Sequence, residues 1–176
     1  MAESGNIRLE IVTPRGVALR TEVRELAAPS VAGKFGVLPG HLPLLAALEV
    51  GLVQYTPAGS EERESVAVGA GFVEILRDGA LLLTDRFMAQ KEVDVLAVRE
   101  RLHEVDEELG RWEGELRDPH RLELVEEEQW LAAQLELYGD PPVPRLLEHV
   151  RTVDYSGVIP GEPEPGEPDV PPPEAP

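Results

Sequence analysis

Histidines are the first side chains in this chain of 176 residues whose chemistry could hold a metal ion or move a proton. A zinc site built on histidine usually needs two of them a few residues apart on one element, or further ligands close by. The four histidines, His41, His103, His120 and His149, show no His-x-x-x-His spacing and no cluster that would complete such a site. We therefore expect exposed loop or helix histidines and no bound metal.

Motifs for nucleotide binding and for nucleophilic catalysis are incomplete. Residues 33–40 contain glycines but lack the Gly-Lys-Ser/Thr ending that cradles phosphate, and residues 69–71 lead into strand residues rather than into a helix. No Gly-x-Ser-x-Gly elbow is present, and the sequence identifies no partners for Ser60 and Ser65. The sequence predicts no catalytic residue and no cofactor.

Acidic residues dominate the charge. The run Glu126-Glu127-Glu128 could suggest paired catalytic carboxylates, but on exposed helices such runs are overwhelmingly solvated faces. In total 34 acidic residues oppose 16 Lys and Arg, which gives a formal net charge of −18. Because such a chain repels the phosphate backbone, we exclude DNA and RNA as partners.

Cysteine and long apolar segments are both missing from the sequence. Without cysteine, disulfides, thiolate metal sites and a cysteine nucleophile are excluded, and the chain suits a reducing compartment. The first six residues have no basic flank or apolar core of a signal peptide, and no window approaches the roughly 20 apolar residues of a membrane span. The sequence predicts a cytosolic protein with no direct membrane insertion.

The first half of the chain has the pattern of β-strands. Ile7, Leu9 and Ile11 alternate with polar residues before a turn at residues 13–16, as in a strand with one buried face. Further strands are predicted near residues 23–27, 52–55, 64–68, 71–76 and 80–84, with turns at residues 57–60 and 78–79. Strands at this spacing indicate a sandwich or a flattened barrel.

From Val93 onward the pattern is helical. The apolar positions of the first helix recur in steps of three and four: Val95, Val98, Leu102, Val105, Leu109, Trp112 and Leu116. Asp118 and Pro119 end that helix and begin a second one, which closes at Gly139. Its less regular apolar positions are Leu122, Leu124, Val125, Leu131, Leu135 and Tyr138. We expect an antiparallel hairpin that leans on another surface, because two helices alone bury their seam only in part.

Two further segments follow the hairpin. Residues 145–153 place Leu146, Val150 and Val153 on one helical face and could form a short third helix. Residues 157–176 contain eight prolines, five acidic residues and no basic residue. This composition cannot bury a core and predicts a disordered, semi-extended tail.

One loop gives the sharpest clue to a family. Phe35-Gly36-Val37-Leu38-Pro39-Gly40-His41-Leu42-Pro43 places two prolines and two glycines among aliphatic residues, which restricts the chain to one path. Together with residues 9–14, 69–75 and 81–85, in that order, it resembles the epsilon subunit of the F-type ATP synthase. The resemblance spans roughly residues 6–138.

The resemblance implies an α+β fold in several parts. It implies an N-terminal β-sandwich of about ten strands over residues 1–88 and a C-terminal antiparallel two-helix hairpin over residues 89–140, which the pattern also indicates. A possible short helix over residues 141–156 and a disordered tail rich in proline and glutamate over residues 157–176 complete the organisation.

The function implied by the resemblance is that of a non-catalytic central-stalk subunit of a proton-translocating ATP synthase. Such a subunit couples the gamma subunit to the c-ring, and it meets the catalytic head of alpha and beta subunits if its hairpin extends. It would lie on the cytoplasmic face of the bacterial inner membrane, attached through the complex.

By position, the partner interface implied by the resemblance consists of Lys34, Phe35, Gly40, His41, Leu42 and Pro43. For Phe35, Val37 and Leu38 the alternative is that the loop plugs one end of the sandwich, whereas for His41 we favour contact with a partner. The family often has an acidic residue where this chain has Lys34, which implies a different polar contact with the ring.

Two regulatory properties of relatives do not transfer. Relatives that bind ATP carry Ile/Leu-Asp-x-x-Arg-Ala; here Asp94 is retained, but Ala97 replaces the arginine, so we expect no useful ATP binding. Asp94 is then a charge favoured by the start of the helix. Inhibitory relatives have a basic second helix, whereas this one is acidic, so we expect weak or absent inhibition of hydrolysis.

Two other hypotheses remain open. The chain could be a free-standing module whose sandwich binds a small molecule and whose hairpin forms a homodimer. Alternatively, it could keep the epsilon identity and use the hairpin as a nucleotide sensor. Copurification distinguishes the first alternative, because the epsilon subunit should form a complex with gamma and the c-ring and the free-standing module a soluble homodimer. Titration with Mg-ATP tests the nucleotide sensor.

Overall fold

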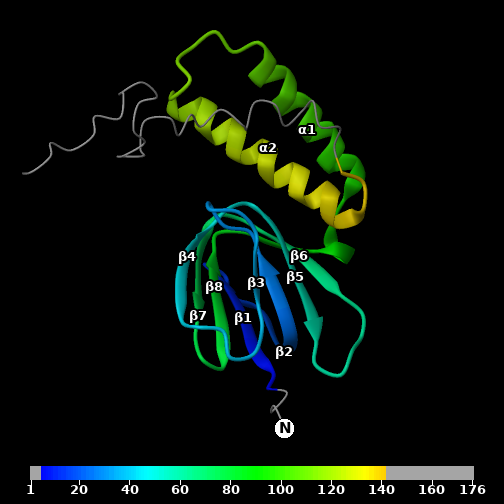
Figure 1. Cartoon of the computed structure of the whole chain (residues 1–176). Helices are drawn as coiled ribbons and strands as arrows, with labels where there is room; N and C mark the ends of the chain where they lie inside the picture. Colours follow the sequence, from blue (N-terminus) through cyan, green and yellow to red (C-terminus); the bar gives the residue numbers. More distant parts are fainter. Residues whose placement is uncertain (1–4, 142–176) are drawn as a thin grey trace, which may run out of the picture.

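A computed structural model describes residues 5–141, so the third helix and the tail that we expect lie outside the described residues. Within them, a β-sandwich carries two helices at one end (Figure 1). The elements are β1 (Ile7–Thr13), β2 (Gly16–Ala28), β3 (Phe35–Val37), β4 (Leu44–Leu48), β5 (Gly51–Pro57), β6 (Glu64–Val68), β7 (Gly71–Ile75), β8 (Gly79–Thr84), β9 (Phe87–Ala89), a 3₁₀ turn (Gln90–Glu92), α1 (Val95–Gly110) and α2 (Pro119–Tyr138).

The long strand β2 belongs to both layers of the sandwich. Its first half pairs with β1, and its second half pairs with β5 on one side and β3 on the other, with a shift of register between Val23 and Glu25. The hydrogen-bonded path is β4-β7-β8-β1-β2-β5-β6-β9, in which only β1 and β8 are parallel. A sheet that folds over on itself at one strand in this way closes a core without a second, separate sheet.

Alternating apolar residues fill that core. Leu9, Ile11, Val53, Val73 and Leu82 are fully buried, and each faces inward from a strand whose neighbouring residues face out. The β-sandwich followed by two helices is therefore confirmed as an α+β fold, with nine strands in the described part where the resemblance implied about ten.

Three of the nine strands were not predicted: β3, β4 and β9. β3 lies inside the Pro- and Gly-rich loop, and β4 lies in the apolar run that follows it. The sequence of β4, Leu-Leu-Ala-Ala-Leu, has no alternation and no β-branched residue, so nothing local favours a strand. Pairing with β7, from Leu44 opposite Ile75 to Leu48 opposite Gly71, decides its conformation.

The first helix ends earlier than the apolar spacing predicts. The spacing is confirmed as far as Leu109, but α1 stops at Gly110, and Trp112 and Leu116 lie in the connection to α2. Trp112 still packs against the seam, whereas Leu116 is 69% exposed. Glycine is a poor helix former and commonly marks the end of a helix. Our prediction followed the apolar spacing past Gly110 and therefore made the helix too long.

The second helix begins and ends where predicted, but its buried seam is different. Asp118 accepts the backbone N–H of His120 at 2.9 Å, and Gly139, with φ of 98°, ends the helix. The buried seam consists of Leu124, Glu128, Leu131 and Leu135, whereas Leu122 and Tyr138 are exposed. The expectation of a solvated acidic run is wrong for Glu128, which is fully buried.

Helix α2 attaches the hairpin to the sandwich. Its Ala133 and Leu137 pack against Leu52 of β5 and Ala67 of β6. Next to this contact the Arg86 guanidinium lies 3.2 Å from Glu126 of α2 and 5.9 Å from the Trp130 ring. The expectation that the hairpin leans on another surface is confirmed.

Candidate docking surface

The Pro- and Gly-rich loop forms a tight turn. The N–H of His41 donates to the carbonyl oxygen of Leu38 at 3.0 Å, Pro39 takes the second position, and Gly40 has φ of 83°, as a type II turn requires. Val37 is buried and Phe35 packs onto the core, as expected if these two side chains close one end of the sandwich. Leu38, in contrast, is 59% exposed.

The polar side chains of this loop make internal contacts. The Lys34 ammonium donates to the side-chain oxygen of Gln54 at 2.5 Å, and Nδ1 of His41 lies 2.7 Å from the carbonyl oxygen of Leu42. Gly40, Leu42 and Pro43 are exposed, and His41 is half-buried. Contact of these residues with a partner stays a prediction.

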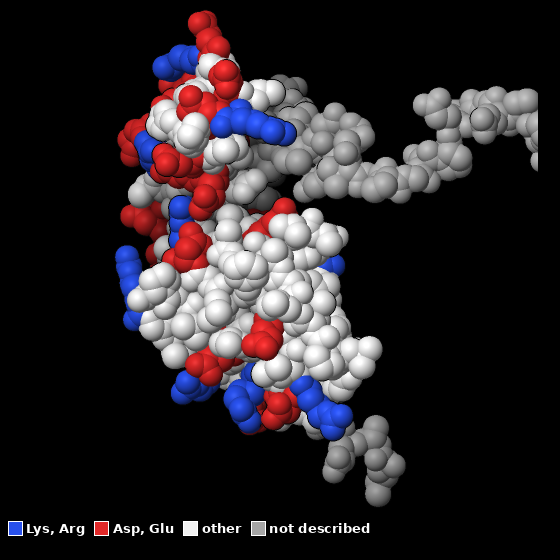
Figure 2. Space-filling model, turned by 90° about the vertical axis from the view of Figure 1, so that its left-hand side faces the viewer, with Lys and Arg blue, Asp and Glu red and all other residues white. Residues whose placement is uncertain are grey.

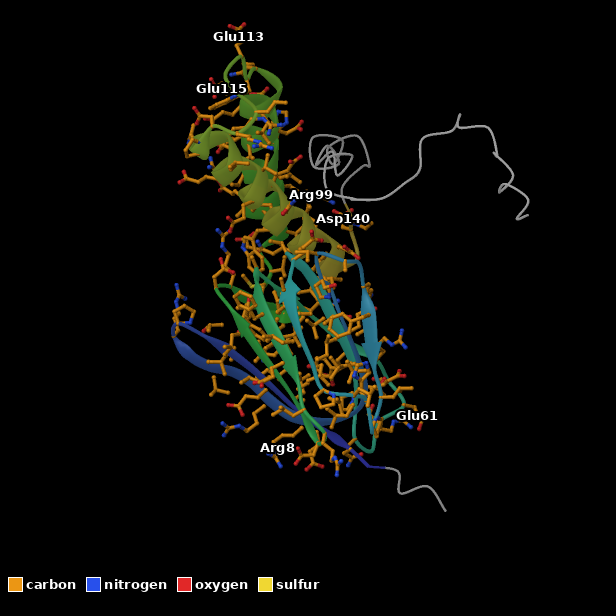
Figure 3. All side chains as sticks on the ribbon, turned by 60° about the vertical axis from the view of Figure 1, so that its left-hand side comes forward. Arg8, Glu61, Arg99, Glu113, Glu115 and Asp140 are labelled. Atoms are coloured by element: carbon orange, nitrogen blue, oxygen red, sulfur yellow. The ribbon has the colours of Figure 1, made fainter. Side chains whose placement is uncertain are left out.

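The loop lies at the end of the sandwich that is far from the helices. It enters β4 at Leu44, which pairs with Ile75 just before the turn between β7 and β8. At the other side of that turn the N–H of Arg8 donates to the carbonyl oxygen of Asp78. Figure 3 places Arg8 at the end of the sandwich opposite the tip of the hairpin, where Glu113 is labelled.

A second feature is an apolar row on the outer face of one layer, at the end of the strands nearer the helices. The cross-strand register aligns Ala47, Phe72, Leu83, Val12 and Val17 on five neighbouring strands. Phe72, Leu83 and Val17 are 57%, 48% and 51% exposed. An outward-facing row of a solvated sheet is normally polar, so this row indicates a face that is covered by another molecule.

The row at one end of the strands and the loop at the other are together called the docking face: Val12, Val17, Leu38, Leu42, Leu45, Phe72 and Leu83. Leu42 and Leu45 are 79% and 70% exposed and join the loop to the row through β4. Figure 2 shows the sandwich from the side of β4 and β7, where few charged residues interrupt a broad uncharged area. Acidic residues crowd instead on the helices above it.

Our sequence reasoning missed the row itself. The signal was present at residues 81–83, where three consecutive leucines fill both faces of a strand that should alternate. Leu82 faces the core and Leu83 faces out. Which leucines would align across the strands could be found only from the pairing register.

Asp94 acts as the cap of α1. Its side-chain oxygen accepts the N–H of Ala97 at 3.2 Å, so the retained acid of the ATP motif satisfies a free donor of the first helical turn. Within residues 5–141 no group of three or more acidic or histidine side chains is placed to hold a metal ion. Neither of the two helices described is long and apolar enough to cross a membrane.

The fold and the docking face define a class of protein: a β-sandwich with a docked two-helix hairpin and an exposed apolar face. Residues 6–90 match the family model described as the beta-sandwich domain of the ATP synthase delta/epsilon chain. The ATP synthase epsilon chain of Carboxydothermus hydrogenoformans is 34% identical over 60% of this chain and 77% of its own length. An epsilon chain of Syntrophotalea carbinolica is 40% identical over 64% of this chain and 75% of its own length.

A solved structure shares the fold. A chain in the cryo-EM structure of the Euglena gracilis mitochondrial ATP synthase superposes with a TM-score of 0.63 at 18% identity, covering 75% of this chain and 80% of that one. This chain belongs to the epsilon-chain family of ATP synthases.

Proposed function

We propose that the chain is a non-catalytic central-stalk subunit of a proton-translocating F-type ATP synthase, and that it couples the gamma subunit to the c-ring. It would lie on the cytoplasmic face of a bacterial inner membrane, attached through the complex. The observation that carries this proposal is the docking face, supported by membership of the family.

The outer row of the docking face is the surface that we assign to gamma. Phe72 and Leu83 project from the paired strands β7 and β8, whose register fixes their separation. Full burial of such a side chain is worth about 1.5–3 kcal/mol. A rigid sheet that buries several of them transmits torque through shape, with no bond made or broken.

The loop at the distal end is the surface that we assign to the c-ring. It projects from the sandwich on the side opposite the helices, and its exposed residues are small or apolar apart from Lys34. The Lys34 ammonium, which donates to Gln54, lies at an exposed position from which we expect it to contact a polar loop of the ring.

In this proposal α2 keeps the hairpin attached to the sandwich, with weak or absent inhibition of hydrolysis. Two of the acidic residues of α2 are engaged: Glu126 with Arg86 and Glu127 with Arg101. The acidic helix therefore has partners within this chain, and it lacks the basic charge by which we expect an inhibitory helix to bind the catalytic subunit.

Copurification tests the proposal. The full chain should copurify with gamma and the c-ring, and Phe72→Glu should weaken this association at least tenfold, because a carboxylate would be buried in the interface. Leu96→Glu is the matched control, since Leu96 is 77% exposed and lies on α1, which contributes no residue to the docking face. If the chain forms only a soluble homodimer, or if Phe72→Glu binds like the unaltered chain, the proposal fails.

Crosslinking and truncation test its parts. A cysteine placed at Lys34 or His41 should crosslink to a rotor subunit, and failure of both to reach one would remove the loop assignment. Hydrolysis by the assembled enzyme should change little when the chain is cut after Gln90. Strong activation by the cut would contradict weak inhibition.

A further inference from the structure

The seam between α1 and α2 contains a carboxylic acid. Glu128 is four residues from Leu124 and three from Leu131, which is the spacing of the seam itself. The side chain is fully buried, and neither carboxyl oxygen has a hydrogen-bond partner among the described residues. An ionised carboxylate at such a position is costly, whereas the neutral acid costs much less.

No cation fully compensates for this burial. Asp106 of α1 adds a like charge, and the attraction of Arg121 on α2 offsets the burial only in part. The nearby guanidinium of Arg101 is bound to Glu127 and Glu104. Burial first, and then Asp106, raise the pKa of Glu128 to about 7.

The guanidinium of Arg86, which lies between β8 and β9 and contacts α2, is also occupied. It is bound to Glu126 and Asp85, so it is not free to pair with the buried acid. Because these guanidinium groups are paired with other acids, the buried carboxylate of Glu128 is neutralised by binding a proton.

The seam is also what holds α1 in place. The buried cluster that contains Val98, Leu102 and Val105 draws its members from the two helices and from residues next to them, with no residue of a strand. Helix α2 has the additional contact of Ala133 and Leu137 with the sandwich. Weakening the seam would therefore free α1 while α2 remains attached.

We propose that Glu128 is a proton switch of the hairpin: α1 and α2 pack while the acid holds its proton, and α1 separates when the proton is lost to water. No other bond changes. The inference depends on contacts within this chain, so it stands or falls independently of the proposed function.

The direction of the pH dependence follows from linkage. Glu128 has an ordinary pKa of 4.5 when the helices are apart and a pKa of about 7 when they are packed. The packed state therefore binds the proton more tightly, is most stable below pH 4.5, and loses stability as the pH rises to about 7. Since each pKa unit is tenfold, the equilibrium changes by about two orders of magnitude over this range.

Spin-label distances in the full chain test the switch. The chain has no cysteine, so Glu62→Cys on the sandwich and Glu100→Cys on the exposed face of α1 can be labelled alone. We expect one short-distance population at pH 5 and an added broad, longer population at pH 8, with the ratio of separated to packed α1 at least tenfold higher. A second pair, Glu62→Cys with Glu136→Cys on α2, should keep its distance.

Three variants isolate the group responsible. Glu128→Gln and Glu128→Leu, which retain every other titratable group of the helices, should remove the response to pH, whereas Glu136→Gln, at an exposed position of α2, should retain it. Distances in the unaltered chain that do not depend on pH would overturn the proposal. So would a response that persists in both Glu128 variants, or movement of the α2 pair equal to that of α1.

Discussion

Arg101 of α1 binds Glu127 of α2 through two parallel contacts, with Nε 2.7 Å from Oε1 and Nη2 2.9 Å from Oε2. The next residue, Glu128, is buried without a partner. Hydrogen bonding from Arg101 lowers the pKa of Glu127, while burial raises that of Glu128. Two adjacent acids of one helix therefore contribute to stability with opposite dependence on pH.

Replacing Arg101 with glutamine should destabilise the hairpin by about 1 kcal/mol near pH 7, because both groups of the pair are partly exposed and screened by water. The effect should shrink at 1 M salt and in acid, as the pH falls through the lowered pKa of Glu127. Hydrogen exchange of α1 amides measures it. Arg111→Gln, which removes a pair with Glu107 at the C-terminal end of α1, is the control and should leave the contact between the helices unchanged.

Replacing Glu128 with leucine should stabilise the helices by about 2–3 kcal/mol at pH 8 and by much less at pH 5. At pH 8 the substitution removes the cost of a buried ionised acid, whereas at pH 5 the acid is already neutral in the packed state. Hydrogen exchange of α1 at the two pH values gives the difference directly. Equal stabilisation at both values would show that the effect is packing alone.

Replacing Gly71 with alanine should destabilise the sandwich by about 3 kcal/mol or more. Gly71 has φ of 157°, and a Cβ there would lie 1.9 Å from the carbonyl oxygen of Leu83 on the paired strand. Urea unfolding measures the change. Gly110→Ala at the end of α1 meets nothing within 4 Å and should be neutral or slightly stabilising, so a similar loss there would contradict the steric argument.

Replacing Asp94 with alanine should cost about 1 kcal/mol of helix stability, and asparagine should restore most of it, because either Asp or Asn can accept the N–H of Ala97. Thermal unfolding of the three proteins gives this order. In a calorimetric titration of the unaltered chain with millimolar Mg-ATP we expect no saturable binding, and saturation would restore the hypothesis of a nucleotide sensor.

Much of the fold could be predicted from local pattern. Alternation at Ile7, Leu9 and Ile11 identified β1, and the capping pair Asp118 and Pro119 located the start of α2. These features depend on neighbours within one or two turns of chain, so the sequence displays them directly. Strand β4 could not be found this way, because its conformation comes from pairing with β7, about 27 residues further on.

The candidate site was predicted only in part. The loop around Pro39 and Gly40 was identified because those two residues restrict the backbone by themselves. The apolar row through Phe72 and Leu83 depends on register between strands, which no single segment contains.

The amino-acid sequence by itself determined six of the nine strands, the two helices and the turn at Pro39, because each of these depends on residues close together in the chain, and it determined the excess of negative charge by composition. Only the tertiary structure decided that Phe72 and Leu83 face water side by side and that Glu128 is buried while Glu127 is paired. Burial and pairing depend on contacts between segments that are distant in the chain. From the pattern of its own helix alone, Glu128 is predicted to be solvated, and only the packing of α1 against α2 buries it.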